Sequence, residues 1–129
     1  MFEMKFTALA TFAALACTFV LSAKVGRMRG KHEIKAPATT GHPEFERAFR
    51  VHGNTVEQLV LLLPLMWMAT AVVGDAWSAA AGAVWVAGRI VYARDYMRDP
   101  TVRGTGMVVT ALPTFALFIV VLAGILNSF

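Results

Sequence analysis

The sequence is poor in charge and nearly devoid of cysteine. Charged residues make up 16% of its 129 residues, whereas a soluble domain typically carries about 25%. Cys17 is the only cysteine, which excludes an internal disulfide and a metal site built from several cysteines. Hydrophobic residues make up 57% of the chain, so the composition argues against an ordinary soluble domain. The length allows one domain at most.

Four runs of the sequence lack charged residues altogether: 6–23, 58–74, 76–88 and 104–129. A membrane-spanning helix needs about 20 mostly apolar residues, and the first, second and fourth runs satisfy this requirement. The third run satisfies it only if its helix continues to about Tyr96. We therefore expect an all-α integral membrane protein, a four-helix bundle forming one domain over 1–129, with helices near 6–26, 48–73, 76–96 and 104–127.

The first apolar run has an alternative interpretation as a cleaved signal peptide. Its 18 uncharged residues exceed the usual apolar region of about 7–15 residues. The first five residues are not clearly basic, and Ser22-Ala23 is a poor cleavage site. A retained helix is the favoured interpretation.

Basic residues are distributed asymmetrically between the predicted loops. Segment 24–50 holds seven of the 12 Lys and Arg residues and segment 89–103 holds four more, whereas Lys5 is alone on the other side. The positive-inside rule therefore predicts that both loops are cytoplasmic and both termini lie outside. The basic pI is explained by this orientation signal and requires no nucleic-acid partner.

Two polar stripes enter the predicted membrane from the cytoplasmic side. The first lies on the second predicted helix: Arg47, Arg50, Asn54 and Glu57. Its spacing of i, i+3, i+7 and i+10 keeps these side chains within an arc of roughly 80°. The second lies on the third predicted helix: Arg89, Tyr92 and Tyr96. Arg103 follows Pro100, which is expected to break that helix, so Arg103 joins this stripe only if the turn brings it back.

A simpler interpretation of the second stripe is membrane anchoring. Arg89, Arg94 and Arg98 would then hold the helix at the interface with the tyrosines as an aromatic belt, and both interpretations stay open at this point. Glu57 is harder to explain in this way, because an ionised side chain at a helix centre costs roughly 2.5–3.5 kcal/mol on insertion scales. We expect Glu57 to have a functional role and to pair with an arginine of its own helix or of a neighbour.

The histidines do not indicate a metal site. His32 and His42 are expected to be solvated loop residues. His52 is expected to be an interfacial polar residue, because no cluster of ligands accompanies it in the sequence. The sequence therefore predicts no metal.

A pocket of several arginines, two tyrosines, one asparagine and one glutamate suits a particular ligand chemistry. Arginine binds carboxylates through two parallel hydrogen bonds, and Glu57 is able to receive an ammonium group. Glutathione, with two carboxylates and one amine, is compatible with this set, although composition alone does not single it out. An arginine or a tyrosine hydroxyl would stabilise its thiolate, since lowering a thiol pKa by about two units needs only about 2.7 kcal/mol.

The same residues resemble the MAPEG family, the membrane-associated proteins in eicosanoid and glutathione metabolism. Segment 43–57 is similar to the family's E-R-x-x-R-x-x-x-N-x-x-E signature. Segment 89–96 with Arg103 resembles its third-helix pattern R-x-x-Y-x-x-x-Y and downstream arginine. The resemblance covers nearly the whole chain. It implies a four-helix protomer, a homotrimer, and glutathione bound between neighbouring protomers near the cytoplasmic side.

The resemblance also implies roles for individual residues. Arg103 matches the arginine that stabilises the glutathione thiolate, and is the implied catalytic residue. The implied glutathione contacts on the second and third helices are Arg50, Asn54, Glu57, Arg89, Tyr92 and Tyr96. An arginine at the end of the first helix holds a glutathione carboxylate, and the alignment leaves this role open between Arg27 and Arg29.

Three positions depart from the specialised branches of the family. Gln58 stands where leukotriene-forming members have a tyrosine. Gly53 and Gly104 stand where prostaglandin E synthase-like members have an arginine and a serine. We therefore expect a bacterial-type glutathione transferase or peroxidase of the inner membrane, with its active site facing the cytoplasm. Its second substrate is expected to be an apolar electrophile or a lipid hydroperoxide.

Two other function classes stay open at this point. The family also contains a member that presents fatty acid without chemistry, so a non-catalytic lipid-binding scaffold is the alternative hypothesis, and the presence of Arg103 argues against it. Small four-helix multidrug exporters place an essential carboxylate in their first helix. The apolar run 6–23 has no charge, which disfavours that class.

Overall fold

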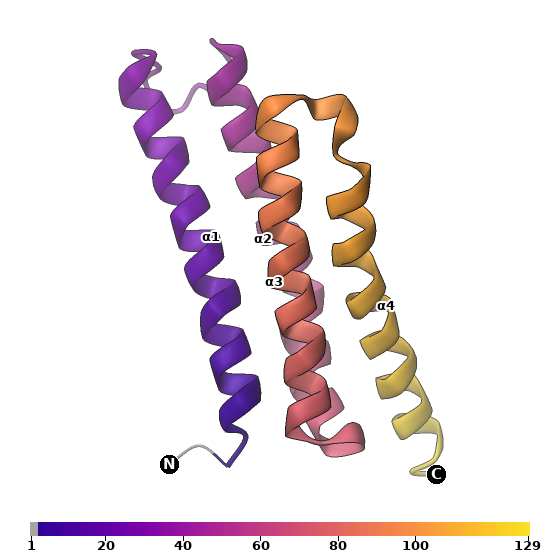
Figure 1. The fold of residues 1–129 in the computed structure, drawn as a ribbon. Helices are drawn as coiled ribbons and strands as arrows, with labels where there is room; N and C mark the ends of the chain where they lie inside the picture. Colours follow the sequence, from indigo (N-terminus) through magenta and orange to yellow (C-terminus); the bar gives the residue numbers. More distant parts are fainter. Residues whose placement is uncertain (1–2) are drawn as a thin grey trace.

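The computed structural model describes residues 3–129, and its helices run alternately up and down a bundle (Figure 1). They are α1 (Lys5–Lys31), α2 (Pro43–Val73), α3 (Asp75–Arg98), the short 3-10 helix η1 (Pro100–Val102) and α4 (Gly104–Leu126). No strand occurs within the described part of the chain. The start of α1, the end of α4 and the α2–α3 turn lie at one end of the bundle (Figure 1). The α1–α2 loop and η1 lie at the other (Figure 1), which we call the loop end.

The first two helices extend beyond the bounds that the apolar runs predict. α1 continues to Lys31 rather than ending near 26, and α2 begins at Pro43 rather than near 48. Lys, Arg and Met are good helix formers, so the charged residues after the first apolar run continue the helix. Pro43 occupies the first position of α2, and the His42 ring accepts a hydrogen bond from the Glu44 amide at 3.2 Å. A helix with this start needs no apolar residue to begin it.

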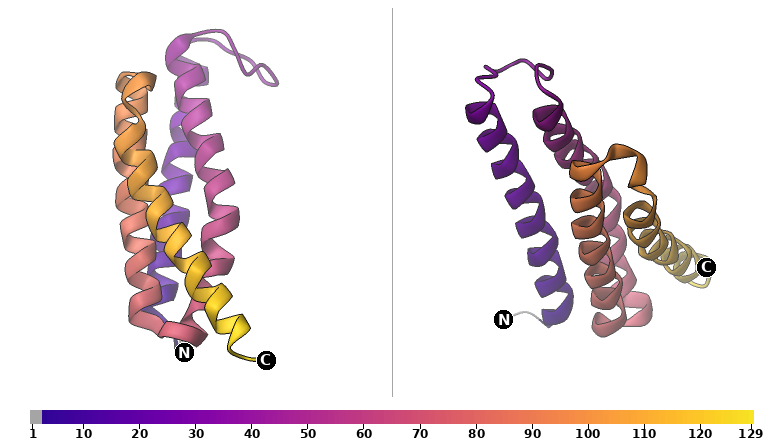
Figure 2. Two further views of the ribbon diagram at one scale, coloured as in Figure 1. Left: turned by 90° about the vertical axis from the view of Figure 1, so that its right-hand side faces the viewer. Right: turned by 45° about the horizontal axis from the view of Figure 1, so that its top comes forward.

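α3 is the central helix of the bundle. It packs against α1, α2 and α4, and α1 and α4 lie on opposite sides of it (Figure 1). α4 crosses the others obliquely, as Figure 2 shows. The middle of the bundle is filled by apolar side chains, of which Trp85, Leu62 and Met66 are fully buried. The polar stripes therefore occupy the loop end, beside this core rather than within it.

Two glycines allow α4 to approach α3 closely. A Cβ atom at Gly88 would lie 2.8 Å from the backbone nitrogen of Thr110, and one at Gly106 would collide with the backbone of Tyr92. Real Cβ atoms do not make such contacts, so any larger residue would push the helices apart. This spacing brings the start of α4 beside Tyr92, where the candidate site lies.

Three segments are long and apolar enough to cross a membrane: α1, α2 and Pro100–Leu126. α3 does not meet this criterion, although it runs the length of the same bundle (Figure 1). Large apolar side chains such as Phe12, Phe19 and Phe115 are exposed on the outside of the bundle. Such a surface is typical of contact with lipid rather than water.

Candidate functional site

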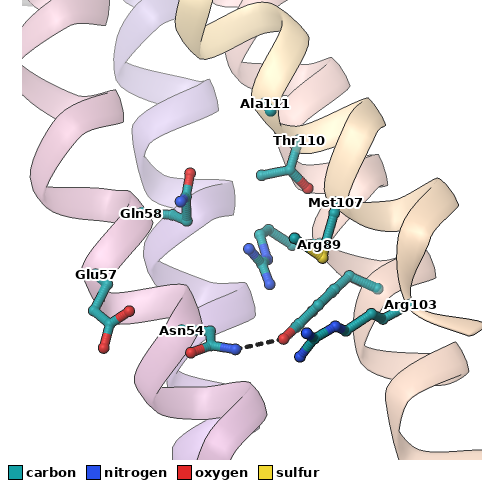
Figure 3. Close-up of a pocket in the computed structure, with 9 residues that line it drawn as sticks. Asn54, Glu57, Gln58, Arg89, Arg103, Met107, Thr110 and Ala111 are labelled. Atoms are coloured by element: carbon teal, nitrogen blue, oxygen red, sulfur yellow. Dashed lines mark hydrogen bonds between the residues drawn. The ribbon is translucent and has the colours of Figure 1, made fainter. Parts of the chain in front are cut away.

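A polar pocket of about 250 Å³ opens between α2, α3 and α4 toward the loop end (Figure 3). We call it the inner pocket. Its lining residues are Asn54, Glu57, Gln58, Arg89, Tyr92, Arg103, Met107, Thr110 and Ala111. It therefore brings together residues of both predicted stripes with Arg103. Ligand pockets usually measure about 300–1,000 Å³, so one chain supplies a site somewhat smaller than that range.

Arg89 is the least expected feature of this pocket. The residue is only 3% exposed, and its Nε and Nη2 atoms have no hydrogen-bond partner within residues 3–129. The guanidinium carbon lies 4.0 Å from the centre of the Tyr92 ring and 6.0 Å from that of Trp85. A buried charge is normally paired and hydrogen-bonded, so these donors leave room for an anionic partner.

The anchoring interpretation therefore fits Arg94 but not Arg89. The Arg94 side chain is 73% exposed and pairs with Asp95 at 3.0 Å, as an interfacial residue would. Arg89 is buried among aromatic rings instead. The two arginines lie on the same helix, yet their surroundings are opposite.

Hydrogen bonding and ring contacts connect the pocket residues. The Asn54 amide donates to the Tyr92 hydroxyl (Figure 3), which joins α2 to α3. The Tyr92 and Tyr96 rings lie 5.5 Å apart, and the guanidinium carbon of Arg103 lies 5.8 Å from the centre of the Tyr96 ring. The second stripe and Arg103 thus form one continuous surface.

The turn around η1 brings Arg103 back to the second stripe. The Asp99 carboxylate accepts hydrogen bonds from the Thr101 amide at 2.9 Å and the Thr101 hydroxyl at 2.8 Å. The hydrogen bond from the Thr101 amide is the main cause that lowers the pKa of Asp99 below its ordinary value. Pro100 ends α3, as the sequence predicts, and the compact turn returns the chain to the pocket within three residues.

Arg50 and Tyr96 line a second depression at the loop end, of about 450 Å³, which we call the outer groove. Arg47 also lines it, but its guanidinium group already donates hydrogen bonds to the backbone of α3. Its Nη1 donates to the carbonyl oxygens of Met97 at 3.2 Å and Arg98 at 3.4 Å. Arg47 therefore satisfies the C-terminus of α3 and fixes it to α2, whereas Arg50 is exposed.

Arg27 and Arg29 lie away from both depressions, on α1. Arg27 is exposed. Arg29 donates from Nη1 to the Ala38 carbonyl at 2.8 Å, and its guanidinium carbon lies 4.7 Å from the Phe45 ring centre. Since α1 and α4 lie on opposite sides of α3 (Figure 1), a single chain does not place either arginine beside Arg103.

Glu57 does not make the ion pair that we expect from the sequence. Its side chain is exposed, and none of the ion pairs among residues 3–129 includes it. Figure 3 shows it apart from Arg89 and Arg103. The prediction is wrong for a single chain, in which Glu57 lines the inner pocket without pairing with its arginines.

An apolar groove of about 340 Å³ continues from the inner pocket along α2 and α4. Gln58 and Ala111 line both depressions. The remaining lining residues of the groove are Leu61, Leu65, Thr114, Phe115 and Phe118. A path therefore leads from the polar pocket to the lipid-facing side of the helices.

Sequence reasoning misses the contribution of α4 to the pocket. Met107 and Thr110 line it, and the Thr110 hydroxyl donates to the Gly106 carbonyl at 2.6 Å. Thr110 is one of few polar residues in the apolar run 104–129, and that rarity is the only signal that marks it. Met107 has no such signal.

The fold and the site together define a class of protein. The chain is an integral membrane protein built of four helices, with arginines and tyrosines gathered in a pocket at one end. The sequence model of the MAPEG family matches residues 7–123, and the chain belongs to this family.

Similar proteins extend this result. An uncharacterised protein of Synechocystis is 39% identical over 124 residues, which are 96% of this chain and 90% of the relative. Human microsomal glutathione S-transferase 2 is 34% identical over 106 residues, 82% of this chain and 72% of the relative. Leukotriene C4 synthase of Cavia porcellus is 29% identical over 127 residues, which are 98% of this chain and 85% of the relative.

Proposed function

We propose that this protein is a membrane glutathione transferase that also reduces lipid hydroperoxides. The observation that carries the proposal is the buried guanidinium of Arg89, whose Nε and Nη2 donors find no partner within residues 3–129. A charged group left in this state costs free energy unless a ligand satisfies it. Similarity to a microsomal glutathione S-transferase and to leukotriene C4 synthase supports glutathione as that ligand.

The polar residues divide the recognition of glutathione among themselves. Arg50 and one of Arg27 or Arg29 hold its carboxylates, and Glu57 holds its ammonium group. Asn54, Arg89, Tyr92 and Tyr96 line the path between these ends. Arg103 stabilises the thiolate at the start of α4, and no step requires a metal.

The reaction begins when the thiol loses its proton to water and the thiolate is held by Arg103. In transfer, the thiolate sulfur forms a bond to an electrophilic carbon, and that carbon releases its leaving group. In peroxide reduction, two glutathione molecules are oxidised to the disulfide while one hydroperoxide is reduced to an alcohol and water. The apolar groove along α2 and α4 admits the second substrate from the bilayer, because its lining suits a hydrophobic molecule.

The working assembly is a homotrimer with glutathione between neighbouring chains. Support for a shared site comes from the small inner pocket and from the exposed Arg50 and Glu57. Arg27 and Arg29 belong to α1 and Arg103 directly precedes α4. These two helices lie on opposite sides of α3 (Figure 1), and a neighbouring copy would bring the α1 arginines to Arg103. All four helices cross the membrane, since α3 packs against each of the other three.

The loops at 32–42 and 99–103 face the cytoplasm and both termini lie outside, as the distribution of basic residues predicts. The similar protein from Synechocystis supports a bacterial membrane. In this orientation the inner pocket opens toward the cytoplasm, where glutathione is supplied, and the apolar groove opens toward the lipid.

The thiolate role of Arg103 is tested by turnover at saturating glutathione. Conjugation of an apolar aryl halide is measured in mixed micelles for the wild type, Arg103→Ala and Arg103→Lys. We expect Arg103→Ala to lower kcat roughly 100-fold, as the loss of one charged stabilising group does, with a smaller change in glutathione affinity. Arg103→Lys retains the charge and is expected to recover part of the rate. Unchanged turnover in Arg103→Ala would show that this residue does not stabilise the thiolate.

The shared site is tested by mixing two inactive variants. One copy carries Arg103→Ala and the other carries Arg27→Ala with Arg29→Ala, and the two are co-expressed. If each site combines two neighbouring chains, random assembly restores about a quarter of the sites to wild-type composition. A site contained in one chain would stay inactive in every mixture. The two single variants of Arg27 and Arg29 then identify the arginine that binds.

The lipid-binding scaffold is the competing function. The apolar groove of about 340 Å³ favours it, because such a groove holds an acyl chain equally well without chemistry. That function predicts binding of a fatty acid and no glutathione-dependent turnover with any electrophile. The turnover assay above therefore distinguishes the two functions directly.

A further inference from the structure

Three side chains with metal-binding atoms meet where α1 ends and α2 begins. They are His32, His42 and Glu44, and one ligand atom of each lies within 4.8 Å of those of the other two. His32 Nε2 lies 2.8 Å from Glu44 Oε2. The two imidazole rings are stacked, with centres 3.6 Å apart and planes inclined by 12°. We call these residues the loop cluster.

The loop cluster corrects an expectation from the sequence. The sequence predicts that His32 and His42 are solvated, and this is wrong for His32, whose side chain is only 14% exposed. The ends of α1 and α2 cause this arrangement. His32 directly follows the last residue of α1, and His42 directly precedes Pro43, the first residue of α2. The end of α1 and the start of α2 lie side by side, so they bring together His32 and His42, which are ten positions apart in the sequence.

We propose that the loop cluster binds a divalent transition metal ion such as Zn²⁺. Two imidazole nitrogens and one carboxylate oxygen are a ligand set that zinc accepts, with water in the fourth position. In the hydrogen-bonded form a proton lies between His32 Nε2 and Glu44 Oε2. A metal ion replaces that proton after a shift of a few tenths of an ångström, because its two ligand atoms lie about 3 Å apart.

Two existing contacts oppose metal binding and make the proposal specific. Lys31 Nζ lies 2.7 Å from Glu44 Oε2, so its ammonium group competes for the carboxylate. His42 Nδ1 accepts a hydrogen bond from the Glu44 amide at 3.2 Å. If Nδ1 is the atom that binds the metal ion, this hydrogen bond is lost. The Lys31 side chain is 55% exposed, which allows it to turn into solvent when the ion enters.

The test is a calorimetric titration of Zn²⁺ into the detergent-purified full chain after removal of any histidine tag. Binding at one site per chain is expected for the wild type and for His52→Gln, the matched control, whose histidine lies outside the loop cluster. His32→Gln is expected to weaken binding at least tenfold, because it removes one of three ligands. His42→Asn should weaken it similarly while keeping a good N-cap for α2.

Lys31→Gln provides the opposite change. It removes the competing ammonium group but leaves all three ligands, so Zn²⁺ is expected to bind several-fold more tightly than to the wild type. This result does not arise from a variant that merely folds poorly. No heat of binding in the wild type, or equal binding in the wild type and in His32→Gln with His42→Asn, would overturn the proposal and indicate adventitious surface binding only.

Discussion

The two ends of the bundle treat their polar groups differently. At the end that carries the α2–α3 turn, Asp75 accepts hydrogen bonds from the Phe6 amide at 3.0 Å and the Thr7 amide at 2.7 Å. Gly74 has a φ of 84° and reverses the chain in one residue, which a residue with a Cβ rarely does. Asp75 thereby satisfies donors at the N-terminus of α1. At this end, the chain meets its own hydrogen-bonding needs.

The loop end leaves such needs unmet. Within residues 3–129, the buried side-chain atoms without partners belong to Arg89, which lines the inner pocket, and to Trp85, one helical turn farther into the apolar core. Arg50 and Glu57 are exposed nearby. Polar groups at the turn end therefore serve the fold, whereas those at the loop end suit a ligand or a neighbouring chain.

The largest effect is expected from Arg89→Met, which removes the buried charge without partners that distinguishes the loop end from the turn end. Methionine fills similar space without charge, so glutathione should bind roughly 100-fold more weakly, as happens when one partner of a buried charged contact is removed. The melting temperature of the ligand-free protein should stay equal or rise, because an unpaired buried charge is removed. Calorimetry and thermal unfolding measure the two quantities.

Arg94→Met is the matched control for this change. Arg94 lies on the same helix, but its side chain is 73% exposed, so glutathione affinity should remain near the wild-type value. Equal losses of affinity in both variants, or a large fall in stability with Arg89→Met, would contradict the distinction between the two arginines.

A second change tests whether helix spacing positions the loop end. Gly106→Ala introduces a Cβ against the backbone of Tyr92, and overpacking of this kind destabilises by about 1–3 kcal/mol. We expect a lower melting temperature together with weaker glutathione binding, since Tyr92 and Arg103 both shift. Gly26→Ala is the control, because its Cβ would meet nothing within 4 Å. Helix propensity predicts that it is neutral or stabilising by up to about 1 kcal/mol.

Asp75→Asn tests the turn end and should have a smaller effect. One amide oxygen cannot serve as the two carboxylate oxygens do, so α1 loses part of its N-terminal hydrogen bonding and the protein melts earlier. Glutathione affinity should stay within about twofold of the wild type, because distant sites act independently. A much larger fall in affinity would show that the two ends are coupled.

The smallest effect concerns the turn that carries Arg103. The pKa of Asp99 is lowered, chiefly by the hydrogen bond from the Thr101 amide. The folded state therefore gains stability from this carboxylate above the ordinary pKa of 3.8, and loses it as pH falls from there through the lowered pKa. Hydrogen exchange of residues 99–103 should accelerate over that acidic range in the wild type. In Asp99→Ala, which has no side-chain oxygen to accept these hydrogen bonds, the exchange should be fast already at neutral pH.

Much of the fold follows from the sequence because apolar length determines helices that cross a membrane. Three of the four predicted helices meet that criterion in the structure, and all four helices are present. The bounds of α1 and α2 were less predictable, because helix propensity continues through charged residues where hydrophobicity no longer gives a signal. Good capping at His42 determines where α2 begins.

The candidate site was only partly predictable for a related reason. Helical spacing correctly groups Asn54 with Glu57 and Arg89 with Tyr92 on the walls of one pocket. It does not reveal how the η1 turn returns Arg103, nor that Arg89 is buried while Arg94 is exposed. Those facts depend on packing between helices, which the period of a single helix does not contain.

The most direct test of the account is equilibrium binding of glutathione to the detergent-purified wild type, followed by the ultraviolet absorbance of the thiolate near neutral pH. The account predicts saturable binding with thiolate formation, both greatly reduced in Arg89→Met. Binding without thiolate would remove the assigned role of Arg103. Absence of binding would contradict the central claim that the unmet hydrogen bonds at the loop end receive glutathione.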